Sequence, residues 1–231
     1  EVSFGPILYG AKKLGMHIHT RYEVSNNAGQ DICDIVNNEG FDFLLVGSGI
    51  SMSDSPDDIA ATRYRTSFYN RYFKRFKAPE SWFYPGALLK DKTKMFIARS
   101  NCDVGVFINR NFVKATNTLV VISSEEDLFL LDYTRTLLKA THGSVGIVAK
   151  MSTTTPGHDQ ILKELWDFVS STPQTQLLPD KDLTPGLFNS YNFMLIGYNT
   201  WNDVSEHRKE ALQKMPSTLI LNKNKRSSSD N

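Results

Sequence analysis

The sequence predicts an α/β protein of two tandem units, each with a parallel sheet flanked by helices. Short apolar runs alternate with segments of helical periodicity, which is the pattern of βαβ units. Two of the runs, GFDFLLVGSG at 40–49 and SYNFMLIGYN at 190–199, are led by aromatic residues and reach a glycine. Each is followed by a helix-like stretch and by a second apolar run that ends in asparagine, a basic residue and asparagine. Two matches in the same order indicate a duplicated unit.

The elements of the first unit follow in order along the chain. Helical periodicity predicts helices at 4–15 and 29–40, and apolar patterns predict strands at 16–25 and 41–47. Gly40 stands where a helix commonly ends. A further helix-like stretch and strand occupy 95–111. The first unit lacks an opening strand, which we expect upstream of residue 1.

The second unit repeats this alternation. We expect strands at 117–123, 144–150, 192–198 and 217–222, and helices at 124–143, 157–171 and 204–215. Ser124 and Asp127 have the spacing of a capping box, and Gly143 is placed to end the first of these helices. The predicted units are 1–114, with a helical insertion at about 50–90, and 115–224. The polar tail 225–231 is predicted to be disordered.

Composition excludes several classes of protein. The 231 residues are 40% hydrophobic and 22% charged, as in a globular domain with a real core. A net charge of +1 gives no overall field for nucleic acid. The apolar runs are far shorter than the roughly 20 residues of a spanning helix. Cys33 and Cys102 lack metal or disulfide spacing, so we expect both to pack in the interior of a protein from a reducing compartment.

Two patterns resemble known families. RSNCDVGVFINRNF at 99–112 resembles the segment that ends the first cytosolic unit of plant and fungal monovalent cation/proton antiporters, where a strand beginning Cys-x-Val-Gly-Val ends in an Asp/Asn-Arg pair. The stretches 18–47 and 119–140 resemble the same family in the order of their elements. The succession of strand, acidic-serine loop, helix, strand, helix and glycine-ended strand resembles the universal stress protein fold.

The resemblance implies the C-terminal cytosolic domain of a fungal potassium/proton antiporter, made of two stress-protein-like units. Its partners would be the transmembrane antiporter domain of the same chain and a second copy in a homodimer, with a further contact to the membrane surface as a possibility. The implied role is regulation or assembly of an ion transporter at the cytosolic face of a Golgi or endosomal membrane. The alternatives are a free-standing nucleotide-binding universal stress protein and a membrane-peripheral scaffold.

A ligand site is expected where parallel strands end, because open α/β sheets bind ligands at their carboxyl edge. The candidate residues are Gly47, Ser48, Gly49 and Ser51 in the first unit, and Ser123, Ser124 and Gly197 in the second. The candidate ligand is an adenine nucleotide or adenosine. The ATP-binding stress proteins carry Gly-x-x-Gly here, but Ile50 and Thr200 replace the second glycine. The acidic loop 125–127 would also repel a phosphate, and the alternative is that these glycines only turn the chain.

No catalytic or metal site is predicted. His17 and His19 fall on one face of the predicted strand at 16–25, but the sequence places no third ligand beside them. A surface or packing pair is the alternative to a metal or pH-sensing pair. Ser48 has Val46 where a nucleophile elbow needs glycine.

The insertion carries a predicted amphipathic helix with an aromatic face. Ser55-Pro56-Asp57-Asp58 has the residues of a helix start, and Ala78-Pro79 those of a stop. Its aromatic face comprises Tyr64, Phe68, Tyr69, Tyr72, Phe73 and Phe76. This face could pack on the chain's own sheet, form a subunit interface, lie on anionic lipid or bind single-stranded nucleic acid. We take the subunit interface as our hypothesis for this face.

Overall fold

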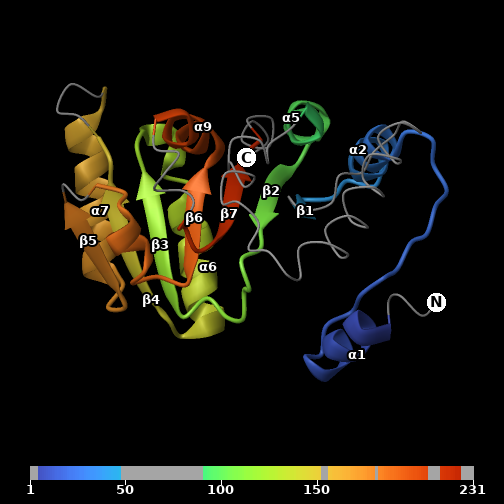
Figure 1. Ribbon diagram of the computed structural model, residues 1–231, viewed down its shortest axis with the longest axis horizontal. Helices are drawn as coiled ribbons and strands as arrows, with labels where there is room; N and C mark the ends of the chain where they lie inside the picture. Colours follow the sequence, from blue (N-terminus) through green and yellow to red (C-terminus); the bar gives the residue numbers. More distant parts are fainter. Residues whose placement is uncertain (1–4, 48–90, 152–155, 180–181, 208–213, 225–231) are drawn as a thin grey trace, which may run out of the picture.

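The computed structural model of the chain describes residues 5–47, 91–151, 156–179, 182–207 and 214–224 (Figure 1). Its helices are α1 (Gly5–Lys13), α2 (Ala28–Asn38), α5 (Asp91–Arg99), α6 (Leu130–Thr141), α7 (His158–Ser171), α8 (Pro185–Phe188) and α9 (Tyr198–His207). Its strands are β1 (Phe43–Gly47), β2 (Asp103–Ile108), β3 (Asn117–Ile122), β4 (Ser144–Ala149), β5 (Thr175–Pro179), β6 (Phe193–Gly197) and β7 (Ser217–Asn222). A 3₁₀ turn, η2 (Glu125–Asp127), joins β3 to α6.

The strands form one sheet in the order β1-β2-β7-β6-β3-β4-β5. Every neighbouring pair is parallel except β2 and β7, which run antiparallel with Val106 opposite Ile220. The fold class predicted from the sequence is therefore confirmed as mixed α/β with a mostly parallel sheet flanked by helices. The antiparallel pair joins the two strands of the first predicted unit to the five of the second. The boundary at residue 114 stays a prediction.

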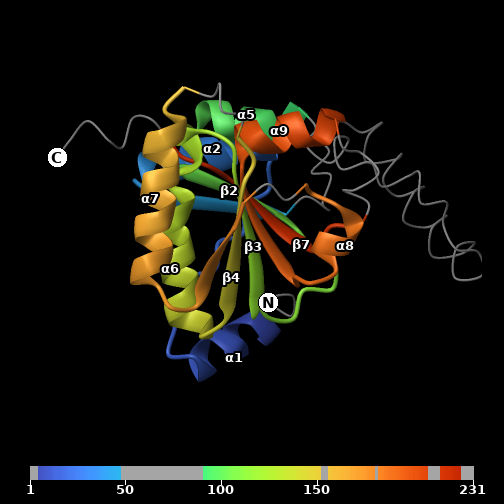
Figure 2. The same cartoon turned by 90° about the vertical axis from the view of Figure 1, so that its left-hand side faces the viewer.

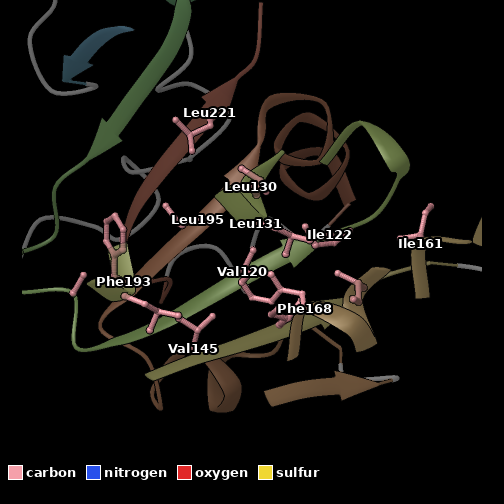
Figure 3. Packing of buried hydrophobic residues seen from close by; sticks show 14 residues of the cluster. Val120, Ile122, Leu130, Leu131, Val145, Ile161, Phe168, Phe193, Leu195 and Leu221 are labelled. Atoms are coloured by element: carbon pink, nitrogen blue, oxygen red, sulfur yellow. The ribbon is translucent and has the colours of Figure 1, made fainter. Parts of the chain in front are cut away.

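Helices cover both faces of the five strands from β7 to β5 (Figure 2). Alternate residues of β3 face opposite sides, so Val120 and Ile122 pack with α6 and α7, while Leu119 and Val121 pack with α9. Figure 3 shows the first of these clusters, in which Phe168 of α7 lies over the sheet. Both layers exclude water from β3 almost completely, as expected of a central parallel strand.

A smaller cluster covers one face of β1 and β2. Cys33 of α2, Phe96 of α5 and Val104 of β2 form its buried centre. Val106 shares this face with Ile220, which packs with α9, so α2, α5 and α9 lie on the same side of the sheet. Both cysteines are buried, as the sequence predicted, and neither is part of a disulfide. Burial from solvent raises the pKa of each thiol, which keeps both in the neutral form.

The predicted strand at 16–25 is wrong. These residues run without regular structure from α1 to α2, and the described part of the chain places no strand beside them. A strand needs a hydrogen-bonded neighbour to satisfy its backbone, so an alternating pattern alone does not make one. His17 and His19 are consequently exposed on an unpaired segment rather than on a sheet face.

Other differences are local. Strand β5 was not predicted, and α9 begins at Tyr198 rather than at residue 204. The capping box of Ser124 and Asp127 forms, although it caps a 3₁₀ turn and not α6 itself. Gly40 has a positive φ, as predicted for a glycine at the end of a helix. At the end of α6, however, the residue with a positive φ is His142. Gly143 is needed for a different reason, because a Cβ there would lie 2.4 Å from the carbonyl oxygen of Thr116.

Candidate functional site

The candidate site lies where β3 and β6 end side by side. The chain leaves β3 toward β4 on one side, and β6 lies on the other, so the strand order reverses here. This is the switch point at which open α/β sheets bind ligands. Ser123 and Ser124 follow β3, and Gly197 ends β6. The three second-unit candidates from the sequence therefore meet at one place.

A buried carboxylate occupies the switch point. Asp127 is only 2% exposed, although it belongs to a surface turn. Its Oδ2 accepts hydrogen bonds from the backbone N–H of Ser123 at 2.8 Å and of Ser124 at 3.2 Å. The hydroxyl of Ser123 also donates to it at 3.2 Å. The Asp127 carboxylate thus takes up two N–H groups that would otherwise face a ligand.

Thr200 closes the arrangement from the side of α9. Its hydroxyl donates to Asp127 Oδ2 at 2.6 Å, a short charge-assisted bond, and it also contacts the hydroxyl of Ser123. Thr200 stands where the Gly-x-x-Gly motif of ATP-binding stress proteins has its second glycine. The residue that departs from the motif is therefore one that binds the carboxylate in place of a ligand.

Gly197 makes close approach of this carboxylate possible. A Cβ at position 197 would lie 2.0 Å from Asp127 Oδ1, so no larger residue fits without displacing the acid. The glycine that the sequence assigned to phosphate binding instead accommodates a side chain of the protein. Beyond it, Asn199 donates its amide N–H to Glu126 at 2.7 Å and ties the start of α9 to η2.

A cleft of about 630 Å³ adjoins η2, between α6 and α7. Its lining residues are Glu125, Glu126, Leu128, Phe129, Leu131, Asp132, Arg135, Glu164, Asp167, Phe168, Ser171 and Lys223. Five carboxylates outnumber the two cations, and one of these cations, Arg135, is engaged by Asp132 at 2.9 Å and lies over the Phe168 ring. The electrostatic character of this cleft disfavours a phosphate.

Asp103 makes hydrogen bonds that link the two parts of the sheet. It lies at the start of β2, in the segment 99–112 that resembles the antiporters. The phenol O–H of Tyr133 on α6 donates to its Oδ2 at 2.9 Å, and the N–H of Asn224 after β7 donates to its Oδ1 at 2.8 Å. Burial, together with the hydrogen bond to this carboxylate, raises the pKa of Tyr133 well above its ordinary value.

The first-unit candidates lie elsewhere. Gly47 ends β1 at the far edge of the sheet, separated from β6 by β2 and β7, and it is exposed. Ser48, Gly49 and Ser51 lie outside the described residues, as do the six aromatic residues of the predicted interface helix. Among the described residues, no group of three or more potential ligands is placed to hold a metal ion. No helix of the described ranges is long and apolar enough to cross a membrane.

Sequence reasoning missed the two residues that define the site. The sequence identifies Asp127 as a helix cap and as a charge that repels phosphate, and it identifies Thr200 as a departure from a motif. It does not show that these two residues contact each other. A signal was present, since an acid three residues after Ser124 reaches back to the strand end through the capping box. The sequence could not show that β6 brings glycine and threonine to the same carboxylate.

Comparisons with known proteins give the fold alone. No protein-family model matches the sequence, and no curated protein matches it. Among solved structures, a universal stress protein from Archaeoglobus fulgidus matches with a TM-score of 0.52 and 10% identity over 97% of this chain and 77% of that one. A protein of unknown function from Pseudomonas aeruginosa PAO1 matches with a TM-score of 0.50 and 10% identity over 96% of this chain and 78% of that one. The chain thus has a universal-stress-protein-like fold.

Proposed function

We propose that this chain is the cytosolic regulatory or assembly domain of a potassium (or sodium)/proton antiporter and acts through protein contacts rather than by catalysis. The stress-protein-like fold is compatible with this role but does not specify it, because one fold serves many functions. The proposed partners are the transmembrane domain of the same polypeptide and a second copy of the chain. The proposed location is the cytosolic face of a Golgi or endosomal membrane.

The observation that carries the proposal is the position of segment 99–112, whose sequence resembles the antiporters. It forms β2, the strand that joins both parts of the sheet, and Asp103 within it binds α6 and the end of β7. A segment in that position contacts both parts of the sheet, which suits the proposed regulatory role. The filled switch point of the second part supports a role that does not depend on nucleotide turnover.

The test compares the full-length protein with a truncated version that lacks these 231 residues. Each protein is reconstituted in lipid vesicles. Potassium-driven proton flux is followed with an internal pH dye. We expect the shortened protein to transport still, at a rate changed several-fold or with a shifted pH dependence. Equal flux and pH dependence in both versions would exclude regulation, and a full-length gene without membrane-spanning segments would exclude the antiporter.

The second candidate is a free-standing nucleotide-binding stress protein, which the similarity to the Archaeoglobus protein supports equally well. For this chain the site favours adenosine over ATP, because the Asp127 carboxylate already binds the Ser123 and Ser124 N–H groups. A thermal-shift series with adenosine, AMP and ATP at millimolar concentration separates the cases. Stabilisation by adenosine alone supports a nucleoside site. If none of the three compounds shifts the melting temperature, the hypothesis of an adenine ligand is excluded.

A further inference from the structure

The cleft between α6 and α7, which we term the acidic cleft, carries negative charge that its own cations do not neutralise. Its five carboxylates belong to Glu125, Glu126, Asp132, Glu164 and Asp167, against two cations. One of the cations, Arg135, is already paired with Asp132 at 2.9 Å. Glu125 and Asp167 are exposed and have no hydrogen-bond or ion-pair partner among the described residues. The acidic cleft therefore has carboxylates available for a cationic partner.

The base of the acidic cleft is apolar. Its apolar lining residues are Leu128, Phe129, Leu131 and Phe168. The guanidinium of Arg135 lies 4.9 Å from the centroid of the Phe168 ring and pairs with Asp132. The cleft thus already binds one guanidinium between an aromatic face and a carboxylate. A partner with both cations and apolar side chains would fit, because Lys and Arg place their aliphatic stems on apolar surface.

The carboxylates of the acidic cleft are distributed rather than gathered at one point. They come from η2, α6 and α7 and line a cleft of about 630 Å³. Among the described residues, no group of three or more potential ligands is placed to hold a metal ion. A single small ion would leave most of these charges unpaired. The arrangement therefore favours an extended partner that carries several positive charges.

The chain itself contains a segment of complementary composition. Residues 63–77, which we term the basic segment, read RYRTSFYNRYFKRFK and contain six cations, six aromatic residues and no acid. Removing these six cations from the net charge of +1 leaves −5 for the rest of the chain. The basic segment lies outside the described residues. Its sequence supplies the cations that the acidic cleft lacks, together with aromatic side chains for the apolar base.

The chain is long enough to bring the basic segment to the acidic cleft. Helix α5 (Asp91–Arg99) has nine residues, so its two ends are about 13 Å apart. Directly after α5, the carbonyl oxygen of Ser100 accepts a hydrogen bond from the side chain of Asn224 at 2.9 Å. Lys223, the residue before Asn224, lines the acidic cleft. Residues 78–90 can extend over about 43 Å, which is ample for the remaining distance.

We propose that the basic segment binds the acidic cleft of the same chain, with its cations paired to the carboxylates and its aromatic side chains on the apolar base. The competing occupant is the basic segment of a second copy, as in the subunit interface expected from the sequence. Binding within one chain is favoured, because a tethered segment has an effective concentration of about the millimolar range. This inference does not depend on the proposed transport role.

Carbodiimide cross-linking followed by mass spectrometry tests the contact on the 231-residue chain. The reagent joins a lysine directly to a carboxylate, and the lysines of the basic segment are Lys74 and Lys77. We expect them to link to Glu164 or Asp167 and not to Glu206, an exposed carboxylate of α9 outside the acidic cleft. Links that are equally frequent at Glu206 overturn the proposal.

A mixture of isotope-labelled and unlabelled chains separates the two occupants in the same experiment. Links within one chain join two labelled or two unlabelled peptides, whereas links between copies also join one of each. We expect mixed pairs to be almost absent at low protein concentration. Mixed pairs at the frequency of random pairing would assign the acidic cleft to a second copy and overturn the proposal.

Neutralising the acidic cleft measures the effect of the contact on protease access. Trypsin cleaves after lysine and arginine, so binding should protect the basic segment from it. The double variant Glu164→Gln, Asp167→Asn should speed cleavage within 63–77 by roughly 5- to 10-fold, as should high salt, because surface ion pairs are weak and screened. The control Glu206→Gln, Asp34→Asn removes two exposed charges elsewhere and should change the rate by less than about 2-fold. Equal cleavage rates in the two double variants, with unchanged circular dichroism, overturn the proposal.

Discussion

Strands β6 and β1 have nearly the same sequence pattern and very different surroundings. Each consists of five residues that begin with Phe and end with Gly, and in the described part of the chain the next elements are a helix and one strand of the antiparallel pair, β2 or β7. Strand β6 is buried along its whole length, whereas β1 is half exposed and has exposed positions at Leu45 and Gly47. The comparison shows that the pattern of a strand is local but its burial depends on neighbouring elements. Substitutions in the two strands and their surroundings should therefore differ in their effect on the free energy of unfolding.

The largest expected difference is between Leu195→Ala and Leu45→Ala. Removing the buried Leu195 side chain leaves a cavity under α6 and should cost about 2–5 kcal/mol of unfolding free energy. The exposed Leu45 loses little contact in the 231-residue chain, and its removal should cost less than about 1 kcal/mol. Urea unfolding followed by circular dichroism measures both. Equal losses would mean that Leu45 is covered in solution and that the two strands do not differ.

The two terminal glycines provide the second contrast. Gly197→Ala places a methyl group against Asp127 and should cost about 1–3 kcal/mol, since the acid and its partners must shift. Among the described residues, no atom lies within 4 Å of a Cβ at Gly47, so Gly47→Ala should change stability by less than about 0.5 kcal/mol. The same urea titration reads both. A tolerated Gly197→Ala would place Asp127 away from β6.

Thr200→Val tests the hydrogen bond from Thr200 to Asp127 at the switch point. Valine keeps the shape of threonine but cannot donate to Asp127, so loss of a bond to a charged group should cost about 1.5 kcal/mol. Thr136→Val on the exposed side of α6 is the matched control and should be close to neutral. If both substitutions have the same small effect, the hydroxyl of Thr200 contributes nothing to the carboxylate site.

The smallest expected effect concerns Tyr133, which links the two parts through Asp103. Tyr133→Phe should cost about 1 kcal/mol at neutral pH by loss of one hydrogen bond. Because the pKa of Tyr133 is raised in the folded state, its contribution is complete below the unfolded value of about 10 and is lost as pH rises further. The stability gap between wild type and variant should therefore narrow above pH 10. A gap that widens there would contradict the buried, neutral phenol.

Much of the fold could be predicted because its signals are local. The runs that became β3, β4, β6 and β7 are short, apolar and bounded by turn residues, and the helices between them keep their periodicity. Residues 16–25 show the limit, since the same alternating signal has no effect without a neighbouring strand. Strand β5 was missed because TQLLP is short and ends in proline, and its edge position tolerates that residue.

The candidate site could be located from the sequence but not interpreted. Strand ends and glycines predicted a site at the edge of the sheet where Ser123, Ser124 and Gly197 lie together, and the acidic loop predicted weak phosphate binding. The contacts of Asp127 with Gly197 and Thr200 join residues about 70 positions apart, as the 73-residue separation of its bond to Thr200 shows. Such contacts depend on strand order, which no local pattern contains.

The most direct test of the central claim is calorimetric titration of the 231-residue chain with magnesium ATP, repeated with Thr200→Gly. The account predicts no heat of binding for the wild-type chain at millimolar nucleotide, because its own carboxylate holds the N–H groups at the switch point. Saturable binding of ATP that requires Ser123, Ser124 and Gly197 would contradict it. That result would make the second part of the chain a nucleotide sensor.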